Sequence, residues 1–87
     1  MGLNFPNMSR SFLPSRRAVQ FWGHDGALEI SFFITEDALK HIQPDTRCDE
    51  SEMLRAFDSN RSVVHRVAAQ AYRRGGAGSY ELTAKSF

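Results

Sequence analysis

The sequence predicts an α+β fold: an antiparallel four-stranded sheet in β-β-β-α-α-β order, with one short and one long helix packed on one face. Three observations predict it. Two strand-like segments flank a glycine turn at residues 23–26, one amphipathic helical pattern covers residues 49–74, and an alternating segment follows at residues 79–86. A chain of 87 residues forms one domain, residues 1–87, in which residues 1–8 are an irregular lead-in.

The first part of the chain contains three predicted strands. A short strand at residues 9–13 ends at a proline turn, and two longer strands follow at residues 17–22 and 27–34. A hairpin register that sets Gly23 opposite Gly26 places Phe21 across from Leu28 and gathers most large apolar residues on one face. The opposite face then carries Ala18, Gln20, Trp22, Ala27, Glu29, Ser31 and Phe33.

A short helix and a last strand complete the smaller elements. Thr35 is a predicted N-cap for a helix over residues 36–43, which Pro44 ends. Residues 79–86 alternate between apolar and polar side chains, so they are predicted to form a half-buried strand.

The long helix is predicted to begin at Asp49, in a capping box with Glu52, and to end at a glycine pair that follows residue 74. Residues 58–62 are poor helix formers, but the apolar arc keeps its phase across them, which favours one helix, bent at this point. A straight helix of 26 residues spans about 39 Å. A compact chain of this length is only roughly 31 Å across, so the helix either bends there or projects beyond the sheet.

Composition excludes several classes of protein. Cys48 is the single cysteine, so no internal disulfide is expected and the reducing cytoplasm is the expected compartment. No apolar run is long enough to cross a membrane, and no signal peptide is recognised. The three histidines, His24, His41 and His65, lack the spacing of metal ligands, so neither a metal nor a cofactor is expected.

The sequence contains no catalytic motif, and no catalytic residue is predicted. Acidic neighbours oppose thiolate formation at Cys48, whose reactivity the sequence leaves open. The glycines at residues 75–78 follow a helix instead of opening one, which is typical of a connector and not of a phosphate-binding loop. Asp25 next to His24 is explained by turn chemistry. An enzyme is therefore the least favoured class.

The charges are segregated along the chain although the net charge is only +1. Residues 1–24 carry a charge of +3, residues 25–58 carry −6 and residues 59–87 carry +4. Such segregation produces either a basic surface or basic and acidic segments that pair, and pairing is the simpler explanation.

Several segments of the chain resemble a known family. They are residues 5–7 and 16–23, the strand at residues 28–33 that leads into residues 36–39, and the closing residues 80–82. Together they resemble the bacterial family called domain of unknown function 1488. The resemblance extends over nearly the whole chain and implies a small, compact, single-domain bacterial protein. It supplies no activity and no site residues.

Two surfaces are candidates for function. The favoured one is the outer sheet face, where large aromatic side chains predict binding to an unidentified protein partner or self-association; the interface residues are Trp22, Phe33, Gln20 and Glu29. The N-terminal segment could instead cover this face through Phe5 or Phe12. The alternative function is binding of the nucleic-acid phosphate backbone. Its predicted residues are an arginine stripe on the long helix, Arg55, Arg66 and Arg73, extended by Arg16 and Arg17.

Overall fold

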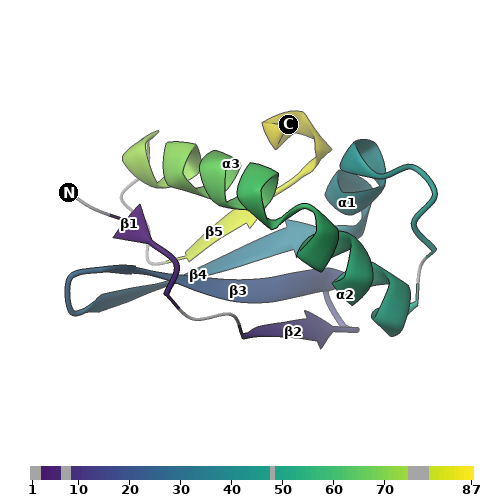
Figure 1. Ribbon diagram of the computed structural model, residues 1–87, viewed down its shortest axis with the longest axis horizontal. Helices are drawn as coiled ribbons and strands as arrows, with labels where there is room; N and C mark the ends of the chain where they lie inside the picture. Colours follow the sequence, from purple (N-terminus) through teal and green to yellow (C-terminus); the bar gives the residue numbers. More distant parts are fainter. Residues whose placement is uncertain (1–2, 7–8, 48, 75–78) are drawn as a thin grey trace.

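The computed structural model describes residues 3–6, 9–47, 49–74 and 79–87. Within these residues the chain forms a five-stranded sheet, three α-helices and one 3₁₀ helix (Figure 1). The α+β class predicted from the sequence is confirmed. The strands are β1 (Leu3–Asn4), β2 (Arg10–Leu13), β3 (Ala18–Asp25), β4 (Leu28–Thr35) and β5 (Ser79–Leu82), and the helices are α1 (Glu36–Ile42), α2 (Glu50–Ser59), α3 (Arg61–Arg74) and η1 (Ala84–Ser86).

The sheet is mostly antiparallel, and its strand count and order differ slightly from the prediction. β3 and β4 form the central pair, β1 and β2 both pair with the free edge of β3, and β5 pairs with β4. The β4–β5 pair is parallel, whereas an all-antiparallel sheet was predicted. The reason is the connection: the three helices carry the chain back to the start of β4, and such a crossover produces a parallel pair.

The β3–β4 hairpin has a different register from the predicted one. Asp25 pairs with Leu28 and Phe21 pairs with Phe32, so the turn contains only Gly26 and Ala27. Gly26 has φ +65, which a glycine at the first position of a two-residue turn adopts without strain. The pairing predicted for Phe21 is therefore wrong by four residues. Because four is an even number, the paired strand residues still lie on their predicted faces, while Ala27, predicted on the outer face, lies in the turn.

Both predicted N-caps are confirmed. The hydroxyl of Thr35 accepts a hydrogen bond from the Ala38 N–H at the start of α1. The carboxylate of Asp49 accepts one from the Glu52 N–H at 2.9 Å at the start of α2. The predicted last strand is shorter than expected, since residues 84–86 turn into η1. The glycine stop at residues 75–78 lies outside the described residues.

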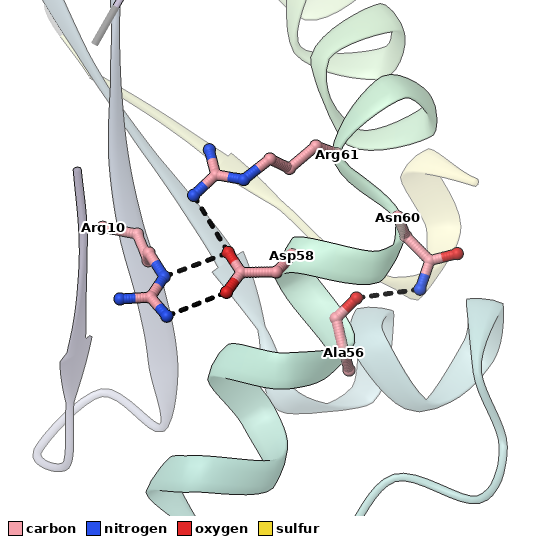
Figure 2. Close-up of polar contacts among 5 residues, drawn as sticks. All are labelled: Arg10, Ala56, Asp58, Asn60 and Arg61. Atoms are coloured by element: carbon pink, nitrogen blue, oxygen red, sulfur yellow. Dashed lines mark hydrogen bonds and ion pairs between the residues drawn. The ribbon is translucent and has the colours of Figure 1, made fainter. Parts of the chain in front are cut away.

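The long helix is interrupted at Asn60, so the prediction of one continuous helix is wrong, while the weak region at residues 58–62 is confirmed. The Asn60 N–H donates to the Phe57 carbonyl, one residue short of the helical partner. The side-chain amide of Asn60 donates instead to the Ala56 carbonyl at 2.8 Å (Figure 2). A side chain thus replaces a backbone donor, and the chain bends without leaving the Ala56 carbonyl unpaired.

An ion-pair cluster fixes this bend against the sheet. Arg10 of β2 donates from Nε and Nη2 to the two carboxylate oxygens of Asp58, at 3.0 and 2.8 Å, and Arg61 Nη2 donates to Oδ1 at 2.9 Å (Figure 2). These donors lower the pKa of Asp58, the Arg10 hydrogen bond being the largest cause. The molecule measures 35 × 23 × 23 Å.

All three α-helices lie on one face of the sheet, and the core lies between them and the strands (Figure 1). α2 and α3 bury apolar residues on the same side in spite of the bend, so the predicted phase of the apolar arc is preserved. None of the described helices is long and apolar enough to cross a membrane. The largest buried core side chains are Phe21, Phe32, Phe57, Ile34, Leu39, Met53 and Leu82.

Candidate functional site

The outer face is the side of the sheet turned away from the three α-helices, and no described helix covers it (Figure 1). Strand alternation assigns residues to it, because Phe21, Phe32 and Leu82 point into the core and their neighbours point the other way. Its residues are Asn4, Ser11, Leu13, Ala18, Gln20, Trp22, His24, Glu29, Ser31, Phe33, Thr35, Ser79 and Glu81.

Trp22 lies in the central strand of this face. It pairs with Ser31 of β4 and is half-buried, so part of its indole remains in contact with solvent. Gln20, two residues earlier in β3, is half-buried as well, while Glu29 of β4 is exposed. All three predicted residues therefore lie on one face of two adjacent strands.

Phe33 lies on the same face but is only 9% exposed, so the expectation that it is open to solvent is wrong. The guanidinium of Arg16 lies over its ring, 3.8 Å from the centroid. The Nη2 atom of Arg16 also lies 3.6 Å from the Oε2 atom of Glu81 in β5. A cation stacked on the ring thus presents a charged surface where the sequence predicted an aromatic one.

Neither Phe5 nor Phe12 covers the outer face, so that alternative is wrong. The Phe5 ring stacks on His65 of α3, with centroids 4.0 Å apart, and lies 6.1 Å from the Phe21 ring. Phe12 pairs with Val19, which is a core residue. Both rings pack on the helix side of the sheet, because β1 and β2 pair with β3 in a register that directs them there.

The outer face carries two charged pairs. Arg16 and Glu81 lie beside Phe33, at the level of Gln20 in β3, and His24 and Glu29 lie at the hairpin end, 3.8 Å apart. These side chains are between 30% and 56% exposed, so neither pair contributes much to folding stability. They form a polar rim around Trp22.

The hairpin end of the face is attached to α3. The hydroxyl of Tyr72 donates a hydrogen bond of 2.6 Å to Asp25. This bond raises the pKa of Tyr72, because the carboxylate stabilises the protonated phenol. Tyr72 also contacts Tyr80 edge to face, at 6.0 Å. The strand that carries Trp22 is therefore held at its far end and is part of a fixed surface.

The five arginines of the nucleic-acid hypothesis do not form one surface. Arg55, Arg66 and Arg73 lie on α2 and α3, which cover the opposite face from Arg16. Arg55 lies 3.6 Å from Glu52, and Arg17 lies 3.7 Å from Glu36. The predicted extension of the stripe to Arg16 is wrong, because that guanidinium packs on Phe33. Nucleic-acid binding stays a prediction.

A groove that the sequence did not predict lies between α1, α3 and η1. Its volume is about 510 Å³, and both apolar and polar side chains line it. Because its walls are far apart in the sequence, no local pattern identifies it. The lining residues include Ile42, Val63, Val67 and Phe87, with His41, Arg66 and Gln70 around them.

The described residues contain no group of three or more acidic, histidine or cysteine side chains arranged to hold a metal ion. His24, His41 and His65 lie on β3, α1 and α3 respectively. Cys48 lies outside the described residues, and its reactivity stays open.

These features define a small α+β protein with one sheet face covered by helices and the other open. The chain belongs to the family described as protein of unknown function DUF1488, whose model matches residues 3–83. The resemblance predicted from the sequence is thereby confirmed. No curated protein matches the chain.

The same fold is found in a crystal structure from Shewanella loihica PV-4, described as a protein of unknown function from the DUF1488 family. The two chains are 15% identical, the match covers 94% of each, and the TM-score is 0.82. At this identity the likeness concerns the fold alone.

Proposed function

We propose that this protein is a non-catalytic protein–protein interaction module that binds its partner through the outer face. The observation that carries the proposal is Trp22, a half-buried tryptophan at the centre of a sheet face that no described helix covers. Tryptophan is the residue type most enriched among those that dominate binding energy, and such residues lie near the centre of interfaces.

The surroundings of Trp22 match the general anatomy of an interface. Its strand is hydrogen-bonded on both sides, and the far end is held through Asp25 and Tyr72, so little ordering is needed on binding. Polar and charged groups surround the apolar centre, as in the rim of known interfaces. They include Gln20 and Glu29, which the sequence assigned to this surface.

Phe33 has a supporting role in this proposal. Its ring holds the guanidinium of Arg16 at 3.8 Å, so Arg16 is the group that meets the partner at this part of the face. Arginine is enriched at interfaces because its planar guanidinium both stacks and donates several hydrogen bonds. Trp22 and Arg16 are thus the two proposed anchors.

The proposed role is binding because the groups in contact on the outer face stack and form ion pairs across a sheet surface. The proposed ligand is a protein and not a small molecule, because small-molecule sites are typically concave. The bacterial cytoplasm is the proposed compartment, on the basis of a single cysteine in 87 residues and of the family resemblance noted in the sequence.

Site-specific photo-cross-linking in the cells that produce the protein tests the proposal. A benzophenone amino acid placed at position 22 is expected to form a covalent adduct with a defined protein, which mass spectrometry identifies. The control places the same group at position 55, on the helix side, where Arg55 is 72% exposed. If position 22 gives no protein adduct beyond those of position 55, the outer face is not an interface and the proposal fails.

A further inference from the structure

We propose that the groove between α1, α3 and η1 is a binding site for a small organic carboxylate with an apolar body. The groove lies on the helix side of the molecule, so this site is separate from the outer face and does not depend on the proposed function. Figure 1 shows η1, at the yellow end of the chain, between α3 and α1.

The groove has the size of a ligand site and walls that are held in place. Its volume of about 510 Å³ falls within the roughly 300–1,000 Å³ that is typical of small-molecule sites. The Ala84 N–H donates to the Asp37 carboxylate in α1, and a capping box between Thr83 and Ser86 holds the turn of η1. The walls are thus in place before a ligand binds.

One stripe of α3 supplies much of the lining. Four lining residues follow one another on this helix at the i, i+3, i+4 and i+7 spacing of a single helical face: Val63, Arg66, Val67 and Gln70. The stripe therefore presents apolar side chains that can contact a hydrocarbon group, and beside them a guanidinium and an amide that can donate hydrogen bonds.

The other two elements add apolar surface and one further polar group. Ile42 and Phe87 are half-buried and pack against the hydrophobic core, so each presents part of its apolar surface to the groove. His41 lines the groove from α1 and is exposed, and its ring nitrogens can donate or accept a hydrogen bond. A mainly apolar lining with a few polar groups is the usual composition of a small-molecule site.

The charge of the groove selects an anion. Arg66 is always charged, and no acidic side chain is among the described residues that line the groove. Elsewhere on these helices the arginines are paired, Arg55 with Glu52 and Arg61 with Asp58. Arg66 has no such partner among residues 3–6, 9–47, 49–74 and 79–87. Its guanidinium is therefore available to a ligand.

A single carboxylate is the anion that fits this charge. The planar guanidinium of an arginine matches the two oxygens of a carboxylate. A carboxylate carries one negative charge, which Arg66 balances, whereas a phosphate monoester carries about −1.5 to −2 at neutral pH and requires further cations. Because Ile42, Val63, Val67 and Phe87 form the apolar part of the lining, the rest of the ligand is a hydrocarbon or aromatic group.

Titration of the full chain, followed by its amide chemical shifts in ¹H–¹⁵N spectra, tests the site. The probes are hexanoate and phenylacetate, and hexanamide and phenylacetamide are their uncharged counterparts of the same shape. At least one carboxylate is expected to give saturable shifts centred on residues 41–42, 63–70 and 86–87 at concentrations up to about 10 mM. Its amide is expected to bind about tenfold more weakly. Acetate, which lacks the apolar body, is expected to give no saturable shift.

Two variants test the role of the guanidinium. Arg66→Gln removes the charge and keeps a polar side chain, so it is expected to raise the dissociation constant of the carboxylate to about that of the amide. Arg55→Gln removes an exposed charge of α2 outside the groove and is expected to leave the dissociation constant unchanged. Because Arg66 is exposed, neither change is expected to alter the fold, which circular dichroism checks.

Each possible result supports or overturns the site. If neither carboxylate gives saturable shifts, or if the shifts lie away from the groove, the groove is not a ligand site. Equal binding of acid and amide, or unchanged binding in Arg66→Gln, overturns the pairing of a carboxylate with Arg66. Tighter binding of hexyl phosphate than of hexanoate overturns the choice of a carboxylate. None of these results changes the adduct expected from position 22, so the site and the proposed function fail independently.

Discussion

The two faces of the sheet show two different ways of covering aromatic side chains. On the helix side, Phe32 is fully buried among other rings, with Phe21 at 5.3 Å and Tyr80 at 5.5 Å between centroids. On the outer face, its neighbour Phe33 is 9% exposed, and the guanidinium of Arg16 lies over its ring. Similar burial therefore has different causes on the two sides.

This difference shows which part of the sheet serves folding and which part remains available for binding. When a ring is removed from a packed core, its hydrophobic burial and its dispersion contacts are lost, and a cavity remains because the surrounding core relaxes only partly. A guanidinium at a surface can rotate away or turn to a partner at little cost. One face of the sheet thus belongs to the packed core, whereas side chains on the other face can change conformation when a partner binds.

The largest expected effect comes from comparing Phe32→Ala with Phe33→Ala. Phe32→Ala is expected to lower the free energy of unfolding by about 3–5 kcal/mol, as is typical for a buried phenylalanine. Phe33→Ala is expected to cost only about 1.5 kcal/mol, because solvent and Arg16 fill the space. Urea denaturation followed by circular dichroism measures both. Equal losses would mean that the outer face is packed as tightly as the core.

A smaller effect is expected at Gly23, where the N-terminal segment closes the helix side of the sheet. A Cβ atom there would lie 2.9 Å from Phe5 Cε1 and 3.0 Å from Leu3 Cδ1. Gly23→Ala is therefore expected to cost about 1–3 kcal/mol by overpacking. Because Phe5→Ala removes part of the clash, the double variant F5A/G23A is expected to lose less than the two single variants together.

Gly26→Ala is the matched control in the same hairpin. An added Cβ meets nothing within 4 Å, but φ is +65, so the expected cost of about 1 kcal/mol comes from the backbone alone. Its effect is expected to add to that of Phe5→Ala without coupling. If the effect of Gly26→Ala on the free energy of unfolding depends on Phe5→Ala, or if that of Gly23→Ala does not, the N-terminal segment does not close the core as described.

The sequence predicted the faces of the strands better than their pairing. Alternation assigned Phe21 and Phe32 to one side and Trp22 and Phe33 to the other, and the structure agrees. The pairing was wrong by four residues, because Gly23 was interpreted as part of the turn. Its role is instead to let the side chains of Leu3 and Phe5 approach the sheet, and no local pattern reveals such a tertiary contact.

The helical region shows the same limit. The poor helix formers at residues 58–62 located the weak region, and the constant apolar phase correctly placed both halves on one face. The interruption itself depends on the side-chain amide of Asn60, which donates to Ala56 and to Gln43 of the chain segment after α1. Gln43 is distant from Asn60 in sequence, so helical periodicity does not predict this contact.

For the candidate site, alternation along the strands was sufficient to group Trp22, Gln20 and Glu29. The burial of Phe33 was missed because Arg16 reaches it from the turn before β3, and the sequence does not fix where a long, flexible side chain lies. The groove beside Arg66 was missed for a related reason, since its walls come from three separate elements. Short-range patterns thus predict on which face of the sheet a side chain lies, whereas long-range contacts decide which groups cover that face.

The smallest expected effect concerns His65, a titratable ring in the otherwise apolar helix-side core. It stacks on Phe5 and lies 5.9 Å from Phe21. Burial lowers the pKa of His65 below 6.5, and the nearby Arg61 lowers it further. In the pH range between the lowered pKa and 6.5, the unfolded chain binds a proton that the folded chain does not. Stability is therefore complete above about pH 6.5 and falls as the pH decreases below it.

Urea denaturation at a series of pH values measures this dependence. His65→Gln is expected to remove the slope below pH 6.5, whereas His41→Gln, on the exposed side of α1, is expected to retain it. Asp58 does not interfere, because its lowered pKa confines its contribution to more acidic pH: that stability is present above 3.8 and is lost as the pH falls through the lowered value. A slope that persists in His65→Gln would assign the effect to another group and leave the stacked ring without a role in the pH response of the core.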